Sequence, residues 1–212
     1  LRDISIELAP GSFTAILGVN GCGKSTLLRQ LKPILQPHGT QTGTILFEGK
    51  SLSSLSQREQ SARIGFVLQN LDAQLVTDKV WHELAFGLES LGLSTPVIRR
   101  RVAEIASFFG IQNWFYKPVC ELSGGQKQML NLASVMAMNP KLLILDEPTS
   151  MLDPLAARSL LDTVERINRE LGVAVLLTEH RLDAVFPVCD RVLVMDGGKL
   201  RIDGAPPKIA AQ

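Results

Sequence analysis

The fold is decided by the octapeptide Gly18-Val19-Asn20-Gly21-Cys22-Gly23-Lys24-Ser25. It matches the spacing G-x-x-x-x-G-K-[ST] at every fixed position. An apolar, strand-like run (residues 12–17) precedes it, and a helix-like run (residues 24–31) follows. In that setting glycines let backbone N–H groups turn inward, next to a helix N-terminus that favours anions. The stretch therefore predicts a polyphosphate-binding loop in an α/β core. The alternative, a chance glycine-rich turn before a helix, is disfavoured because motif and context agree.

The loop supplies most of the candidate nucleotide-binding residues. Lys24 can reach the β- and γ-phosphates of a nucleotide, and the Ser25 hydroxyl can bind Mg²⁺. Cys22 lies near Lys24 and a helix N-terminus, both of which favour a thiolate, so we expect its alkylation to block ATP binding. The alternative is an inert small residue that fills the loop. The candidates in this stretch are Asn20, Gly21, Cys22, Gly23, Lys24, Ser25 and Thr26.

Two acids, Asp146 and Glu147, follow the apolar run at residues 142–145. In open α/β sheets, ligands bind where the strands end. We expect Asp146 to hold Mg²⁺ through water and Glu147 to polarise the attacking water as general base. The alternative is a strand end with two solvated acids. A phosphate loop upstream favours the catalytic interpretation because both features then belong to one mechanism.

The order of elements predicts a mainly parallel sheet. Strand-like runs come first, helices occupy the middle, and strands alternate with a helix after Pro140. The expected strands are residues 2–8, 12–17, 43–47, 63–68, 142–145, 173–177 and 191–195, with a helix at 155–171. The predicted fold is an α/β phosphate-loop NTPase core with an N-terminal antiparallel β part. A helical lobe at about residues 78–140 is inserted into it, all within one domain of residues 1–212.

The helical block begins with recognisable capping residues. Thr77 or Asp78 is expected to cap its first helix, and Ser94-Thr95-Pro96 to open the next. In that second helix Val102, Ile105, Ala106 and Phe109 share one face at helical spacing. We expect this face to pack against the rest of the block.

Composition excludes several classes of protein. A net charge of +1 gives no basic surplus for nucleic acid binding. No apolar run approaches the roughly 20 residues of a membrane span. Three widely spaced cysteines form no disulfide or zinc pattern, which favours a reducing, cytoplasmic setting. Because Leu1 falls inside an expected strand, the chain reads as a fragment with its first strand truncated.

The stretch Leu122-Ser123-Gly124-Gly125-Gln126 resembles the signature sequence of the ABC ATPase family. Physically it is a second anion site, with a serine and glycine amides at a helix N-terminus. The alternative for the pentapeptide alone is a plain helix cap.

The rest of the family pattern follows in order. Gln69 stands in the place of the loop glutamine that senses Mg²⁺ and the membrane partner. Residues 150–153 resemble the D-loop, and His180 stands in the place of the switch histidine. Gln69 alone would mean nothing, and His180 alone would more often be structural, so the joint order carries the resemblance over the whole chain.

The resemblance implies two ATPase domains stacked head to tail, with ATP and Mg²⁺ as cofactors. The phosphate loop and the signature are too far apart to share one ATP within a chain. Ser123, Gly124 and Gly125 are thus expected to contact ATP held by the second domain. That domain is a copy, a paralogue or a tandem repeat. The implied catalytic residues are Glu147 and His180, and the implied metal-binding residues are Ser25, Gln69 and Asp146.

The expected function is ATP hydrolysis that drives a membrane transporter. The chain would lie peripherally on the cytoplasmic face of the membrane, bound to a transmembrane subunit and not to nucleic acid. The alternative is a soluble ABC ATPase of DNA repair or translation. Such proteins typically carry coiled-coil insertions or tandem domains, which this sequence lacks. A regulatory domain with little turnover is disfavoured because Glu147 and His180 are both present.

One segment points to a branch of the family. Gln69-Asn70 through Asp72, Gln74 and Leu75, followed by residues 83–89, resembles energy-coupling-factor ATPases. Those proteins belong to importers of vitamins or transition metals such as cobalt or nickel, and the segment borders the surface that docks the transmembrane subunit. The alternative is a core-facing amphipathic helix, which Leu84 and Leu88 at i, i+4 fit. For the two aromatics, Trp81 and Phe86, core packing is favoured over docking.

Two departures from the family pattern stand out. The aromatic residue that usually stacks on adenine has no counterpart, because it would precede Leu1. Met129 occupies a position that is usually arginine.

Overall fold

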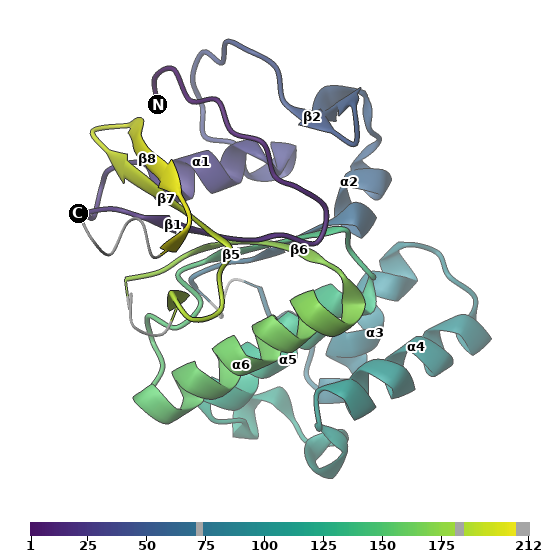
Figure 1. Cartoon of the computed structure of the whole chain (residues 1–212). Coiled ribbons are helices and arrows are strands. Elements are labelled where there is room, and N and C mark those ends of the chain that lie inside the picture. The colour runs from purple at the N-terminus through teal and green to yellow at the C-terminus, as the bar shows by residue number, and fades with distance from the viewer. Residues whose placement is uncertain (71–73, 181–184, 207–212) are drawn as a thin grey trace.

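A computed structural model describes residues 1–70, 74–180 and 185–206. Its centre is a six-stranded sheet in which four neighbouring pairs are parallel and only the β7–β8 pair is antiparallel (Figure 1). In spatial order the strands are β4 (Ile64–Val67), β5 (Leu142–Asp146), β6 (Ala174–Thr178), β1 (Phe13–Leu17), β7 (Arg191–Asp196) and β8 (Lys199–Gly204). The predicted α/β fold with a mainly parallel sheet is confirmed.

Helices cover both faces of the sheet. In Figure 1, α1 (Lys24–Gln30) lies on one side, and α5 (Gly124–Ala137) and α6 (Pro154–Leu171) lie on the other. The remaining α-helices are α2 (Gln57–Arg63), α3 (Val80–Ser90) and α4 (Thr95–Phe108). Short 3₁₀ turns are η1 (Pro33–Leu35), η2 (Leu52–Ser54), η4 (Gln112–Trp114) and η5 (Val119–Glu121). Within the described residues, no helix is long and apolar enough to cross a membrane.

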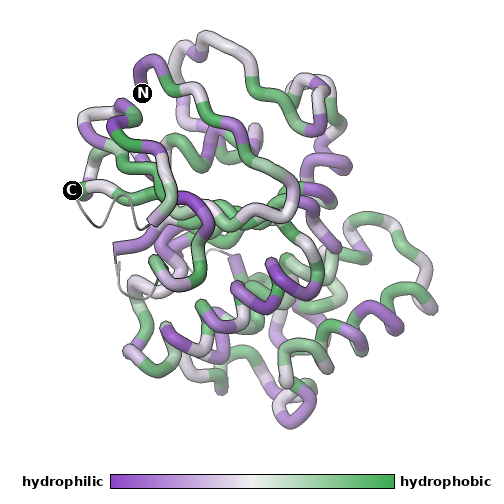
Figure 2. The backbone as a smooth tube through the Cα atoms, in the orientation of Figure 1, coloured by the Kyte–Doolittle hydropathy of each residue, from purple (hydrophilic) through white to green (hydrophobic). Residues whose placement is uncertain are grey.

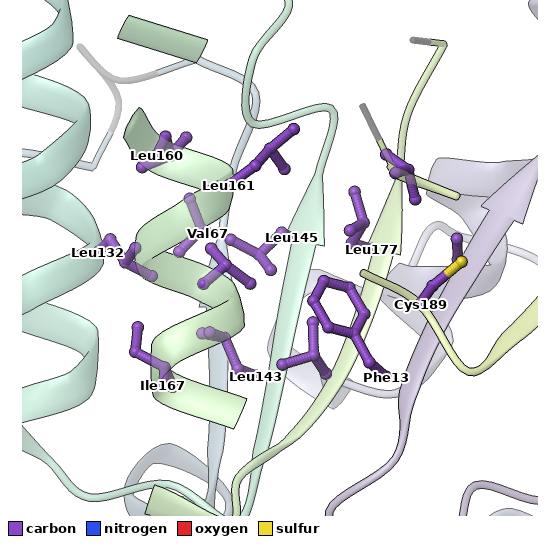
Figure 3. Close-up of a cluster of buried hydrophobic side chains, with 14 of the residues drawn as sticks. Phe13, Val67, Leu132, Leu143, Leu145, Leu160, Leu161, Ile167, Leu177 and Cys189 are labelled. Atoms are coloured by element: carbon purple, nitrogen blue, oxygen red, sulfur yellow. The ribbon is translucent and has the colours of Figure 1, made fainter. Parts of the chain in front are cut away.

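The central strands are buried on both faces because helices flank a parallel sheet on either side. Along β5, Leu143 and Leu145 point into the cluster under α5 and α6, together with Phe13 (Figure 3). The alternate residues Leu142 and Ile144 join the cluster on the α1 side. The hydropathy colouring shows the same arrangement, with apolar strands inside and polar helix faces outside (Figure 2). This double burial explains why β5 reads as an unbroken apolar run.

Local signals set the two ends of α6. The Asp153 carboxylate accepts hydrogen bonds from the N–H groups of Leu155 (3.0 Å) and Ala156 (2.9 Å), and Pro154 takes the first helical position. The helix ends at Gly172, whose φ of 65° is a left-handed conformation that costs glycine little. The D-loop sequence thus leads directly into a capped helix start.

A third apolar cluster joins α3, α4 and α5. On α4, Val102 and Ala106 are buried, Ile105 and Phe109 pack beside them, and the helix starts after Ser94, as predicted. These helices lie in the chain between β4 and β5, which are neighbours in the sheet. The separate lobe at residues 78–140 stays a prediction.

The predicted cap of α3 is wrong. The helix starts at Val80, with Lys79 in the capping position and no side-chain cap. Its first N–H groups instead bond the neighbouring loop, Val80 to Lys117 O (3.2 Å) and Trp81 to Phe115 O (3.1 Å). A tertiary contact therefore replaces the local cap that Thr77 or Asp78 would have provided.

The predicted strand at residues 2–8 is also wrong. Ile4, Ile6 and Leu8 pack against the α1-side cluster, but the segment forms no strand of the sheet. The alternation of the sequence correctly predicted that one side of the segment is partly buried, but such burial does not require a ladder of backbone hydrogen bonds. The antiparallel part is instead the small hairpin of β2 (Leu46–Phe47) and β3 (Lys50–Ser51), and β8 was not predicted.

Gly65 on β4 provides a test of the packing between sheet and helices. A Cβ atom there would lie 2.5 Å from Val135 Cγ1 on α5 and 3.2 Å from Pro140 Cγ. We predict that Gly65→Ala lowers the free energy of unfolding by about 1–3 kcal/mol, because the core would be overpacked. Denaturant unfolding of both proteins measures the difference.

The matched control is Gly124→Ala at the start of α5, where an added Cβ meets no atom within 4 Å. It should leave stability unchanged or raise it slightly. Equal stabilities for Gly65→Ala and the parent protein would contradict the described contact between β4 and α5.

Candidate nucleotide-binding and hydrolysis site

The glycine-rich loop connects β1 to α1, as its sequence predicts. Gly18 allows the closest approach, because a Cβ there would collide with the carbonyl oxygen of Met195 on β7. Gly23 precedes α1 with a φ of 106°, a left-handed conformation, and no side chain caps this helix. The first N–H groups of α1 are therefore not occupied by a capping side chain, as an anion site at a helix start requires.

Lys24 is 4% exposed, and its side chain is held within the loop. Its Nζ donates to the carbonyl oxygens of Gly18 (2.7 Å) and Val19 (3.2 Å). The bonds place a buried positive charge at the centre of the turn. Such a charge costs desolvation and is suited to an anionic ligand.

Ser25 and Asp146 meet at the edge of the sheet. The Ser25 hydroxyl donates to Asp146 Oδ1 at 2.8 Å, and that oxygen also accepts from the Thr178 hydroxyl at 3.1 Å. Asp146 is 1% exposed. Mg²⁺ prefers oxygen ligands such as hydroxyl and carboxylate groups, so Ser25 and Asp146 are suited to bind this ion.

Glu147 lies between two other predicted site residues. Its Oε2 accepts from Gln69 Nε2 (3.0 Å), and its Oε1 is hydrogen-bonded to His180 Nε2 (2.9 Å). The residue has a φ of 47°, in the left-handed region that is uncommon for side chains other than glycine. Strain of this kind concentrates at functional sites. The structure thus brings Gln69, Glu147 and His180 together, and Gln69 reaches the acid pair through Glu147.

The other loop residues have different surroundings. Asn20 and Gly21 are exposed in the turn, and Thr26 is half-buried on α1. Cys22 is 4% exposed and belongs to the apolar cluster on the α1 side. The reactive thiol expected from the sequence is therefore enclosed, and the small-residue alternative fits the structure. Burial outweighs the nearby positive charge because a reagent must first reach the sulfur.

The signature residues form a second, separate feature. Ser123 caps α5 in a capping box: its Oγ accepts from Gln126 N (3.3 Å), and its own N–H donates to Gln126 Oε1 (3.0 Å). Ser123 and Gly124 are exposed, and Gly125 lies against Ala156 at the start of α6. The hydrogen bonds described for Ser123 stay within α5, and no described hydrogen bond joins the signature residues to the phosphate loop of the same chain.

Several residues around the site were missed from the sequence. Thr178 bonds Asp146 and also accepts from the Glu147 N–H (2.9 Å). Gln128, 2% exposed on α5, donates to Pro148 O (3.0 Å), and Glu179 is 3% exposed. Thr178 could have been found, since a parallel register with β5 puts it opposite Asp146.

The segment after Gln69 is anchored by the half-buried side chain of Gln74 and the buried side chain of Glu83. Gln74 accepts from Leu68 N (2.8 Å) and donates to Phe66 O (2.6 Å), while Glu83 accepts from Thr77 N (2.8 Å). Asp72 lies outside the described residues. Beside this segment is a cavity of about 430 Å³, lined by Leu75, Thr77, Asp78, Lys79, Pro118, Val119, Cys120 and Lys127.

The helix that follows the segment is amphipathic, as predicted, with Leu84 and Leu88 fully buried. The expectation of core packing is wrong for Phe86, which is 47% exposed because it lies on the opposite face of the helix from these leucines. Trp81 is half-buried and stacks on His82.

A glycine-rich loop at the end of a parallel strand, with an acid pair two strands away, defines the class of phosphate-loop nucleoside triphosphatases. The family model described as ABC transporter matches residues 1–150. The chain belongs to this family of ABC transporter ATP-binding proteins.

Curated relatives agree with the family assignment. A putative ABC transporter ATP-binding protein of Bacillus cereus is 46% identical over 211 residues, which are 100% of this chain and 38% of that protein. The chain thus spans less than half the length of this relative. The energy-coupling factor transporter ATP-binding protein EcfA1 of Caldanaerobacter subterraneus is 39% identical, over 99% of this chain and 74% of that protein.

Solved structures give the same fold. The cbiO1 structure from Clostridium perfringens, described as part of the ABC transporter complex cbiONQ, has a TM-score of 0.89 and 36% identity over 99% of this chain and 83% of that one. The ATP-binding cassette MJ0796 has a TM-score of 0.81 at 22% identity, over 97% of this chain and 90% of that one, and supports the fold alone.

The three thiols should differ in reactivity. Cys120 is exposed, whereas Cys22 and Cys189 are buried, and burial raises the pKa of the Cys189 thiol to about 11. At pH 8 only about one Cys189 thiol in a thousand is then ionised. We predict that Ellman's reagent modifies one thiol per folded chain quickly and the other two only on unfolding.

Cys120→Ser is the matched variant, and it should remove the fast phase. A fast reaction at Cys22, identified by peptide mass and slowed by ATP, would contradict the enclosed position of this thiol.

Proposed function

We propose that this chain binds ATP with Mg²⁺ and hydrolyses it to drive a membrane transporter. The observation that carries the proposal is the position of Glu147. Its carboxylate is hydrogen-bonded to Gln69 and His180, and the residue directly follows Asp146, which bonds Ser25 of the phosphate loop. One strand end thus joins a candidate base to a candidate ion site.

The residues divide the chemistry between them. The loop at residues 20–26 holds the phosphates, with Lys24 as its positive charge and Ser25, Asp146 and Gln69 as the ion-binding residues. Bound Mg²⁺ supplies charge neutralisation at the β- and γ-phosphates. Glu147 accepts the proton of the attacking water, and His180 donates a hydrogen bond that fixes the carboxylate. The left-handed backbone conformation of Glu147, with a φ of 47°, is part of the arrangement that holds its carboxylate in this position.

We further propose that two such domains complete one another's sites. Ser123, Gly124 and Gly125 are at the exposed start of α5, not at the phosphate loop of their own chain. Gly125 lies against Ala156 of α6, and on the chain just before Ala156 the large apolar side chains of Met151 and Leu155 are 82% and 81% exposed. A second ATPase domain stacked head to tail would cover them and place its ATP at the signature.

A transmembrane subunit is the other proposed partner. Along the chain, Val76 (60% exposed) lies between two residues that line the 430 Å³ cavity, and Tyr116 (79% exposed) lies two positions before a third, Pro118. EcfA1 is named for an energy-coupling factor transporter and cbiO1 for a transporter complex. These relatives support an importer of the energy-coupling-factor type, for a vitamin or a transition-metal ion. The chain would then be one ATPase domain, peripheral to the cytoplasmic face of the membrane.

The role of Glu147 is tested by Glu147→Gln in the full-length protein. We predict that hydrolysis falls at least about 100-fold, because the base is lost, while ATP still binds. Light scattering should then show twice the protomer mass only with ATP, since the trapped nucleotide holds two domains together.

The control is the double variant Lys24→Ala/Glu147→Gln, which should bind no ATP and keep its protomer mass. Full hydrolysis by Glu147→Gln would contradict the base assignment. An ATP-bound protomer that never pairs would contradict pairing between copies of this chain and leave the base assignment standing.

The docking surface is tested by a double variant, Val76→Ser/Tyr116→Ser. We predict at least about tenfold weaker association with detergent-solubilised membrane subunits, because two exposed apolar contacts are lost. Hydrolysis by the isolated protein should stay within about twofold, since no contact among the described residues joins either side chain to the site.

The matched control is Ile34→Ser/Leu46→Ser, which removes two apolar side chains that are 66% and 62% exposed. They lie elsewhere on the chain, in η1 and β2. Equal weakening by both double variants would contradict a specific docking surface after Gln69.

A further inference from the structure

A buried carboxylate next to the site has no part in the mechanism above. Glu179 lies between Thr178 and His180 and is 3% exposed. Its Oε1 accepts from the N–H (3.2 Å) and the hydroxyl of Thr149, and its Oε2 accepts from the N–H of His180 (3.0 Å). A carboxylate withdrawn from water is costly unless several donors satisfy it, and these three are backbone and hydroxyl groups near the reacting residues.

Thr149 and His180, the two residues that Glu179 connects, both lie close to Glu147. Thr149 is two residues after Glu147, in a turn where the Ser150 N–H donates to Glu147 O (3.2 Å). His180 bonds the Glu147 side chain directly. The contacts therefore close a ring that runs from Glu147 along the chain to Thr149, across to Glu179, on to His180 and back to the Glu147 carboxylate.

We propose that Glu179 is a positioning residue for hydrolysis, and this rests on the function proposed above. By bonding Thr149 and the backbone of His180 at once, Glu179 fixes the separation between the turn after Glu147 and the end of β6. That separation determines whether His180 Nε2 meets Glu147 Oε1, which it does at 2.9 Å. The described hydrogen bonds of the Glu179 side chain go to Thr149 and to the backbone of His180, so it acts through His180.

A carboxylate is suited to this task in a way that its amide is not. Both of its oxygens accept, and both are used. A glutamine has the same shape but turns an NH₂ group toward either His180 or Thr149, where it meets another donor. Glu179→Gln should therefore loosen one side of the ring with little change in volume.

The test is the steady-state hydrolysis of ATP by Glu179→Gln, His180→Ala and the double variant. We expect Glu179→Gln to lower kcat about tenfold or more, as for the loss of a hydrogen bond to a charged group. KM for ATP should stay within about threefold, because the phosphate loop is untouched. In the His180→Ala background the same change should have no further effect, since the residue it acts through is gone.

Losses that multiply in the double variant would overturn the proposal, because Glu179 would then act independently of His180. A raised KM at unchanged kcat would also overturn it. Thr149→Val removes one donor and keeps the carboxylate, so it provides a milder variant if Glu179→Gln folds poorly. It should show the same dependence on His180, and Thr149→Ser should restore activity.

A second measurement does not depend on hydrolysis. Amide hydrogen exchange by NMR should be faster at His180 and Thr149 in Glu179→Gln than in the parent protein, with helix α6 unchanged. Unaltered exchange at both amides would overturn the proposal. If the parent protein did not hydrolyse ATP, the proposed function would fail, while the exchange data would still decide whether Glu179 fixes this ring.

Discussion

The hydrogen bond from Ser25 to Asp146 is the contact on which the site depends. It joins residues 121 positions apart in the chain. The two can meet because, in the sheet formed by the described residues, β6 alone separates β1 from β5, and all three strands run parallel and end at the same edge. The register places Thr178, on the middle strand, opposite both Ile16 and Asp146. Its hydroxyl donates to the same Asp146 oxygen that accepts from Ser25. A slip of one residue would turn these side chains to the wrong face of the sheet.

Around this contact, acidic groups are held in surroundings that ordinarily disfavour them. Asp146 and Glu179 are 1% and 3% exposed, and each accepts several hydrogen bonds from hydroxyl or N–H groups. Glu147 adopts a backbone conformation that few side chains tolerate. Such local costs are offset by the sheet beneath, where β5 and β6 are buried along their whole length. The rigid core thus allows a strained and charged edge.

Motifs and periodicity predicted the phosphate loop, the acid pair and the parallel core, because those signals are local in sequence. The strand at residues 2–8 failed because alternation reveals a buried face and not a pairing partner. Thr178 and Glu179 were missed because their roles follow from the register of β6 against β5. The enclosure of the Cys22 sulfur could not be predicted from the sequence, because the apolar cluster around it comes from several elements, whereas its charged neighbour is close in the chain.

The hydrogen bond from the Gln128 side chain to the carbonyl oxygen of Pro148 connects α5 to the turn after Glu147. The same helix begins at Ser123, which offers its exposed end to a second domain under the proposed arrangement. Under that arrangement, a displacement of the Ser123 end would reach the backbone beside Glu147 through less than two turns of helix and the Gln128 hydrogen bond. In two domains paired in this way, nucleotide bound at one site would affect the position of the base at the other. Loss of the Gln128 amide would then let each domain hydrolyse ATP independently of its neighbour.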